Sequence, residues 1–263
     1  MSLAKYYEVA KIHILEKISY SWNQVFYGLI IGIVLFVFVH IWQAIYAGKL
    51  TIEGFSIAQM IWYLALAEVI VFSAGGQGIE RIGEDVKSGI IASSLTKPIN
   101  FVGKEFAVLL ANFIYTFLIS GFIAFAVAYF LVGPIPFHFA NLPMLLVMIA
   151  GAAVLNFTLV IFFGLFAFWF EDVSSIYFIY QKLIFIMGGM LVPIDVYPIW
   201  VQGIVKYLPF SFITYMPAKL FVHFEWSAFL TGMIGQLAWI LVGAMLLKVI
   251  YDKGIKRVNI NGG

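Results

Sequence analysis

The sequence predicts an all-α integral membrane protein with six transmembrane helices. Of its 263 residues, 63% are hydrophobic and only 11% are charged, whereas soluble domains are about 45–50% apolar and about 25% charged. One soluble core could not bury so many apolar side chains, so lipid must cover the excess. Crossing the bilayer takes about 20 residues of helix, and the segments that qualify are residues 22–46, 57–79, 102–132, 142–169, 176–194 and 226–250.

Lysine and arginine residues are distributed unevenly between the two sides of this layout. Of the 15 in the chain, only Lys49, Lys206 and Lys219 fall in the loops of one side. All the others lie at the termini or near the loops of the opposite side. Because positive residues accumulate on the cytoplasmic side of membranes, we expect a multi-pass protein of the cell (cytoplasmic) membrane with both termini in the cytoplasm.

The sequence shows no chemistry of its own. It has no cysteine, and its four histidines are scattered without the spacing of a metal site. Its Gly-Lys pairs, at residues 48–49 and 103–104, lack the further glycine and the Ser or Thr of a phosphate-binding loop. We therefore expect no catalytic residue, no metal and no cofactor, and a net charge of +2 gives no reason to expect nucleic acid.

Residues 1–21 precede the first span and contain a predicted interfacial helix. Within them Leu3, Tyr7, Ala10, Ile14 and Ile18 recur at steps of three and four, which places them on one face of an α-helix. Such a helix is suited to lie in the cytoplasmic interface, in contact with membrane lipid. The alternative is a plain cytoplasmic extension.

A charged stretch, residues 79–97, lies between the second and third spans on the cytoplasmic side. Its apolar residues share one face of a helix, and they are Ile79, Ile82, Val86, Ile90 and Ile91. Its charged residues occupy the remaining faces, and they are Glu80, Arg81, Glu84, Asp85 and Lys87. Pro98 ends the pattern, because proline disfavours a helical residue before it. A regular amphipathic helix here is typical of a docking surface for a partner, and the alternative is a solvated loop.

The outer segment of residues 193–217 contains four prolines, at positions 193, 198, 209 and 217. Between them lie Ile199, Trp200 and Ile204, which are too apolar for an exposed loop. The run is too short to cross the bilayer twice. We expect residues 195–217 to form re-entrant helices that dip into the outer leaflet and are covered by protein.

Few polar side chains fall inside the predicted spans. Glu68 lies halfway along the second span, and Asn112 and Asn156 lie in the third and fourth. A charged side chain at this depth costs about 2.5–3.5 kcal/mol on insertion scales, so Glu68 must face protein or water. These residues are candidates for a transport pathway, and the alternative is that they form hydrogen bonds between helices.

Three motifs carry a resemblance to a known family. They are GEDVKSGIIASSLTKPIN at residues 83–100, FAFWFEDVSSI at residues 166–176, and GGMLVPIDVYPIW at residues 188–200 followed by YLPF at residues 207–210. In this order, over essentially the whole chain, they resemble ABC-2 type permeases, the membrane subunits of type V ABC exporters. The first motif is similar to that of a group of such permeases with poorly known substrates, often encoded in pairs.

The resemblance implies several roles. Residues 80–97 would be the coupling helix that docks in a groove of a separate ABC ATPase subunit. The residues that would contact the ATPase are Glu80, Arg81, Glu84, Asp85 and Lys87. Residues 1–21 would be the elbow helix, and residues 195–217 would close the pathway on the outside. A second copy of the chain or a sibling permease would complete the pore, and ATP would bind only to the ATPase partner.

These features predict a membrane-spanning permease subunit of an ATP-driven ABC exporter, with residues 1–263 as a single transmembrane domain. An ion-coupled secondary transporter is one alternative, but such carriers usually place several ionisable residues at the midplane, where this chain has one clear carboxylate. An intramembrane enzyme would need a catalytic constellation that the sequence lacks. A non-transporting signalling or scaffold subunit is a further alternative. The sequence does not identify the substrate. Because the pathway contains few charged residues, lipid-like or amphipathic molecules are favoured over ions.

Overall fold

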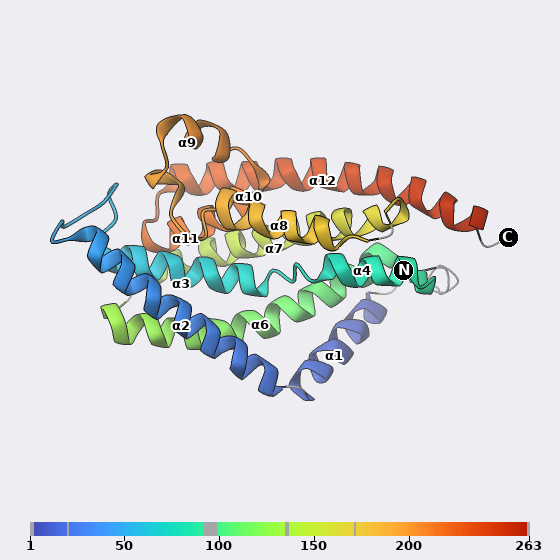
Figure 1. The fold of residues 1–263 in the computed structure, drawn as a ribbon, viewed down its shortest axis with the longest axis horizontal. Coiled ribbons are helices and arrows are strands. Elements are labelled where there is room, and N and C mark those ends of the chain that lie inside the picture. Colours follow the sequence, from blue (N-terminus) through green and yellow to red (C-terminus); the bar gives the residue numbers. More distant parts are fainter. Residues whose placement is uncertain (1–2, 20, 92–98, 135–136, 171, 262–263) are drawn as a thin grey trace.

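The computed structural model describes residues 3–19, 21–91, 99–134, 137–170 and 172–261, and most of these residues are helical. The long helices run side by side along the longest dimension of the molecule (Figure 1). They are α2 (Ser21–Tyr46), α3 (Ile57–Ser73), α6 (Phe101–Val132), α7 (Leu142–Gly164), α8 (Ser174–Met187) and α12 (Trp226–Asn261). The predicted all-α class is therefore confirmed for the described residues.

Five helical stretches in the described chain are long and apolar enough to cross a membrane. They fall on α2, on α3 together with the helix that follows it, on α6, on α7 and on α12, and they correspond to five of the six predicted spans. The remaining predicted span, residues 176–194, corresponds to α8, which has 14 residues and is therefore about 21 Å long. Since the hydrocarbon layer is about 30 Å thick, α8 alone does not cross it, and the six-span layout stays a prediction.

The predicted second span, residues 57–79, is divided between two helices. Helix α3 begins behind a capping box, in which the Ser56 side chain accepts a hydrogen bond from the Gln59 backbone N–H, and it ends at Ser73. The backbone then turns at Gly75, whose φ of 67° lies in the left-handed region that glycine adopts without strain. Helix α4 (Gly78–Lys87) starts after this turn. The last six residues of the predicted segment therefore form the turn and the start of α4.

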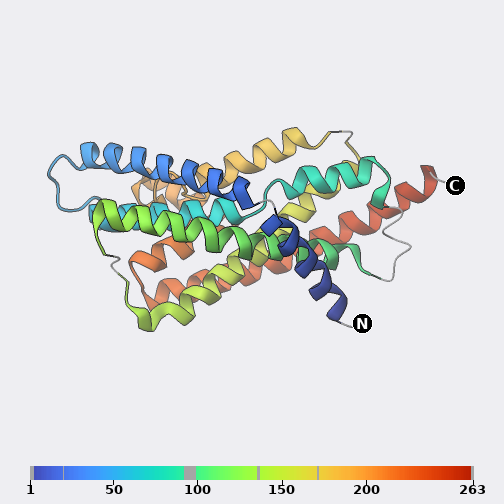
Figure 2. The same cartoon turned by 90° about the horizontal axis from the view of Figure 1, so that it is seen from below.

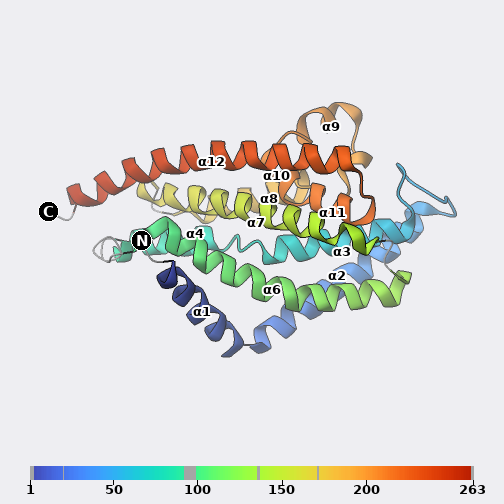
Figure 3. The same ribbon diagram turned by 180° about the vertical axis from the view of Figure 1, so that it is seen from behind.

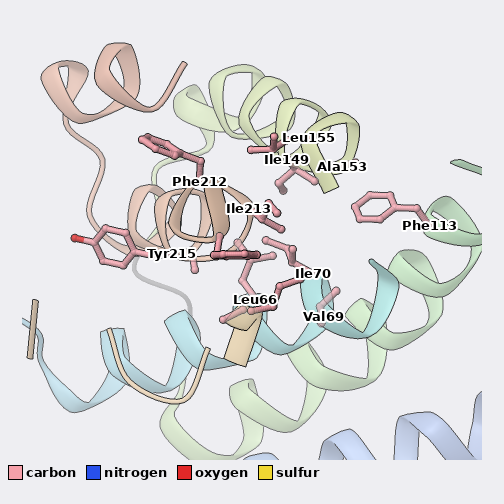
Figure 4. Packing of buried hydrophobic residues seen from close by; sticks show 14 of the residues in the cluster. Leu66, Val69, Ile70, Phe113, Ile149, Ala153, Leu155, Phe212, Ile213 and Tyr215 are labelled. Atoms are coloured by element: carbon pink, nitrogen blue, oxygen red, sulfur yellow. The ribbon is translucent and has the colours of Figure 1, made fainter. Parts of the chain in front are cut away.

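Helix α3 is the centre of the bundle. Every residue from Met60 to Ile70 is buried, and α2, α6 and α11 pack around the helix. Figure 4 shows Leu66 and Ile70 of α3 directed towards Ile213 and the side chains of α7. A helix that is apolar on all sides is expected in the interior of a large helical protein.

Between α8 and α12 the chain forms four short helices at the predicted re-entrant segment. They are η3 (Ile194–Val196), α9 (Ile199–Val205), α10 (Pro209–Ile213) and α11 (Tyr215–Val222). Prolines precede η3 and α9 and open α10, since the fixed φ of proline suits a helix start. Helices α10 and α11 are mostly buried, whereas α9 protrudes from the bundle (Figure 1) with Trp200 74% exposed.

The two ends of the bundle carry different elements. One end, here called the α9 end, holds the loop between α2 and α3 together with α9 (Figure 1). The other, the α4 end, holds α4 and both chain termini, as the turned views show (Figures 2 and 3). Both termini therefore lie at the same end of the bundle, and their placement in the cytoplasm stays a prediction.

Helix α1 (Ala4–Ser19) lies obliquely to the long helices at the α4 end (Figure 3). It packs on α6, where Tyr6 approaches Gly103. None of its residues is buried, and Tyr7 and Ile18 are 65% and 52% exposed. An oblique helix with exposed apolar side chains beside apolar spans is suited to contact lipid.

The absence of cysteine allows the orientation to be tested with single introduced cysteines. Lys49 and Lys87 are both exposed and lie on opposite sides of the predicted topology. We expect Lys49→Cys to react with a membrane-impermeant maleimide in intact cells, and Lys87→Cys to react only after permeabilisation, because of the positive-inside rule. Labelling of residue 87 from outside would refute the topology.

Candidate functional site

Helix α4 presents an apolar face to the bundle and a charged face away from it. Ile79 and Ile82 are fully buried, and a Cβ on Gly83 would lie 2.3 Å from a methyl group of Val173. The exposed positions of the helix are Glu84 and Lys87. The predicted amphipathic helix is thus present over residues 78–87.

The helix ends earlier than the sequence pattern predicts. Gly89 has a φ of 76°, which interrupts the helical path because residues with a side chain rarely adopt it. Ile90 is consequently 51% exposed, although the helical wheel placed it on the apolar face. The rest of the predicted helix, residues 92–97, lies outside the described residues.

Ion pairs fasten α4 to the first turns of α6. The Arg81 guanidinium donates a hydrogen bond to the carboxylate of Glu105, whose side chain is 0% exposed. Lys104 lies 3.3 Å from Glu105 and 3.9 Å from Asp85. Burial raises the pKa of the Asp85 carboxyl, although the positive charge of Lys104 opposes the shift.

The five predicted coupling residues therefore divide into two groups. Arg81 and Asp85 make ion pairs within the chain, whereas Glu84 and Lys87 are exposed and Glu80 is half-buried. The sequence did not identify Glu105, because it reads as one acidic residue near the start of an apolar span. The signal that could have identified Glu105 is its position at the start of an apolar span. A carboxylate that becomes buried there needs a positively charged partner.

A cavity of about 710 Å³ lies between α1, α2, the α3–α4 turn, α6 and α8. Its charged and titratable lining residues are His13, Glu16, Lys17, Arg81 and Lys182. Its other polar lining residues include Gln77, Asn112, Thr116, Ser120, Tyr177 and Gln181. Its apolar lining residues include Ile31, Val71, Phe72, Ile184 and Phe185. Of the three predicted pathway residues, Asn112 lies in this wall.

Glu68 lies next to the cavity without lining it. It is 1% exposed, and neither carboxylate oxygen has a hydrogen-bond partner among the described residues. Residues three and four positions apart share a helix face, and Val71 and Phe72 on that face line the cavity. Glu68 is therefore about one turn beyond the cavity, towards the α9 end.

Asn156 makes hydrogen bonds between three helices. Its amide donates to the backbone carbonyl of Ala74, at the end of α3, and accepts from the hydroxyl of Tyr180 on α8. The residue is 1% exposed and is not among the residues that line the cavity. The structure thus places Asn156 in an interhelical network and Asn112 in the cavity wall.

A second ionic cluster holds the short helices at the α9 end. Asp195 accepts hydrogen bonds from Tyr215, at 2.8 Å, and from Lys219, at 3.0 Å, and Lys206 lies 3.3 Å away. Burial of Asp195 opposes its ionisation, but Lys219, Tyr215 and Lys206 outweigh this effect and hold its pKa below the usual value. One carboxylate therefore connects η3, the end of α9 and α11. In the described part of the chain, no three His, Asp or Glu side chains gather as they would around a metal ion.

The fold and these sites define a multi-pass α-helical membrane protein with an amphipathic helix at one end and an amphipathic cavity beside it. Comparison with models of protein families matches residues 29–262 to the ABC-2 family transporter protein. The match covers most of the chain, so the chain belongs to this family, and the resemblance in its motifs is confirmed. It is a transmembrane permease-type component of the ABC transporter class. A sequence search of curated proteins finds no match to the chain.

The pair between Arg81 and Glu105 allows a test of how α4 is held. We expect Arg81→Gln to destabilise the protein by about 2–3 kcal/mol. Removing one partner of a buried pair typically costs about 3–5 kcal/mol, but the Arg81 side chain is 34% exposed and Lys104 still lies near Glu105. Adding Glu105→Gln should recover part of the loss, since the unpaired buried charge is then removed. The measurement is thermal unfolding in lipid nanodiscs. Additive losses in the double variant would contradict the pairing.

Proposed function

We propose that this chain is the membrane-spanning permease subunit of an ATP-driven exporter in the cell membrane, driven by a separate ABC ATPase subunit. The observation that carries the proposal is the exposed charged face of α4, at the same end as both termini. Family members generally work with ABC ATPase subunits, and this sequence contains no phosphate-binding loop of its own. The α4 end would then be cytoplasmic.

In this proposal Glu80, Glu84 and Lys87 contact the ATPase, while Arg81 and Asp85 secure α4 to α6. ATP binding would change the position of the ATPase, and the movement would pass from α4 through Arg81 and Glu105 to α6. Such a ligand can shift the membrane helices only if the ATPase binds the two states with different affinity. Two permease subunits, either identical or siblings, would enclose the pathway between them.

A charge-reversal variant tests the docking surface. We expect Glu84→Lys with Lys87→Glu to weaken capture of the ATPase by about tenfold or more, because reversing charges in a desolvated contact commonly costs about 2–5 kcal/mol. Both residues are exposed, so the folded bundle should be unaffected. The measurement is a pull-down from membranes containing equal amounts of wild-type and variant permease.

The matched control is Asp252→Lys with Lys253→Glu, which makes the same charge changes at exposed positions of α12. It should bind the ATPase as the wild type does. Purified permease alone should hydrolyse no ATP. Normal ATPase capture and transport by the α4 variant, or robust hydrolysis by the permease alone, would refute the proposed function.

Glu68 favours one competing function, an ion-coupled carrier, because its carboxylate is buried without a hydrogen-bond partner in the part of the chain that the structure describes. We expect Glu68→Gln to insert normally and to change the rate of transport or its dependence on pH, since the amide cannot bind or release a proton. Glu68→Leu serves as the comparison variant, because it removes the hydrogen-bonding groups that Glu68→Gln keeps. If transport by Glu68→Gln is unchanged across pH while Glu68→Leu is impaired, Glu68 has a packing role. If wild-type transport needs an ion gradient but no ATPase, and Glu68→Gln abolishes that dependence, the carrier replaces the exporter.

A further inference from the structure

Lys182 is a charged residue at an unusual place in the bundle. It is the ninth residue of α8, so it lies about 12 Å from the start of an otherwise apolar helix. Its ammonium is 4.9 Å from the centre of the Phe178 ring and 5.6 Å from that of Phe185. The Lys182 side chain is exposed, and an ionisable residue on an apolar helix of a membrane protein is a candidate for a ligand or ion pathway. Lys182 lines the cavity described above.

The cavity contains more positive than negative charge. Its acidic residue, Glu16, lies 3.1 Å from His13, which compensates the carboxylate only when protonated, and burial lowers the pKa of His13. The charge of Arg81 is compensated by Glu105. Lys17 and Lys182 also line the cavity, and neither forms an ion pair with a described carboxylate. Two ammonium groups against the one carboxylate of Glu16 leave a net positive charge at the cavity, which favours an anionic group.

The remainder of the wall combines a polar stripe with apolar side chains. Asn112, Thr116 and Ser120 recur at every fourth position of α6, which aligns them over about 12 Å. The Ser120 hydroxyl is used within the helix, where it donates to the Thr116 carbonyl. The Asn112 amide makes no hydrogen bond with the described residues and is half-buried, so it is available to a ligand. Ile31, Val71, Phe72, Ile184 and Phe185 supply apolar wall.

We propose that this cavity binds an amphipathic molecule with an anionic headgroup and an apolar chain, with Lys17 and Lys182 at the headgroup and the apolar wall along the chain. This inference deepens the proposed function and rests on it for the statement that the bound molecule is the transported one. The volume of about 710 Å³ falls within the range of about 300–1,000 Å³ that is usual for ligand sites. A free inorganic anion would leave the apolar wall unused, and a neutral lipid would leave the two lysines unpaired.

The test uses the full-length chain in nanodiscs of phosphatidylcholine, without ATPase or nucleotide. The probes are phosphatidylglycerol and phosphatidylcholine that carry the same photoactivatable acyl chain, and mass spectrometry maps their adducts. We expect the phosphatidylglycerol probe to label cavity peptides of α6 and α8 about tenfold more than the phosphatidylcholine probe, given the attraction of two lysines for an anionic headgroup. Lipid-facing peptides of α12 should be labelled equally by both probes.

Variants assign the effect to the cavity. Lys17→Gln with Lys182→Gln should reduce labelling by the anionic probe to that of the zwitterionic one. The matched control, Lys248→Gln with Lys253→Gln, removes the same charge from α12 and should label as the wild type does. Asn112→Phe, which narrows the cavity without changing its charge, should reduce labelling by both probes. Unchanged thermal unfolding of each variant in nanodiscs confirms its fold.

Soluble competitors test the contributions of the anionic headgroup and the apolar chain separately. Dodecyl phosphate should protect the cavity peptides, and glycerol phosphate should not. Protection by glycerol phosphate would mean that the site takes a free anion, and equal labelling by both lipid probes would mean that it does not select charge. Either result overturns the inference, as does undiminished labelling of the lysine variant. None of these outcomes affects the ATPase pull-down, so the inference and the proposed function can fail separately.

Discussion

The structure depends on how buried polar groups are paired where α3 ends inside the bundle. A backbone that leaves a helix exposes carbonyl groups, and away from water each must find a partner within the protein. Asn156 provides one, because its amide binds the carbonyl of Ala74 and accepts the hydroxyl of Tyr180. The bonds fix α3, α7 and α8 relative to one another at the turn. The direction of α4 and the wall of the cavity, which Ala74 and Tyr180 both line, follow from this arrangement.

Charged residues in this molecule have two roles. Those in ion pairs hold helices together, and those without an ionic partner are available to bind a partner protein or a ligand. Glu105 and Asp195 are each surrounded by positive groups, and one lies near each end of the bundle. Glu84 and Lys182 have no such partner among the described residues. Separating a buried carboxylate from its positive partner leaves an uncompensated charge, so the paired groups are held in place. The exposed or cavity-lining charges without partners are the ones available for docking and for a ligand.

The sequence predicted the long helices well where length and composition decide the outcome. The third predicted span, residues 102–132, differs from α6 by one residue at its start, since a run of apolar residues that long has no other stable state in lipid. Hydropathy could not reveal where some helices end. Glycines at positive φ mark these ends, Gly75 after α3 and Gly189 after α8. The charged face of α4 was also predictable from periodicity. The partners of Arg81 and Asn156 were not, because these contacts join residues 24 and 82 positions apart in the chain.

Helix α6 connects the two surfaces to which function is assigned. Its fifth residue, Glu105, holds α4, and Asn112 lies seven residues further along, which is about 10 Å on the same rigid helix. A helix held by its hydrogen bonds transmits a displacement along its axis instead of absorbing it. Because α3 is buried on all sides, it cannot move without repacking the core, whereas α6 is more exposed along its length. A pull on α4 would therefore act first on α6, and through it on the polar stripe that lines the cavity.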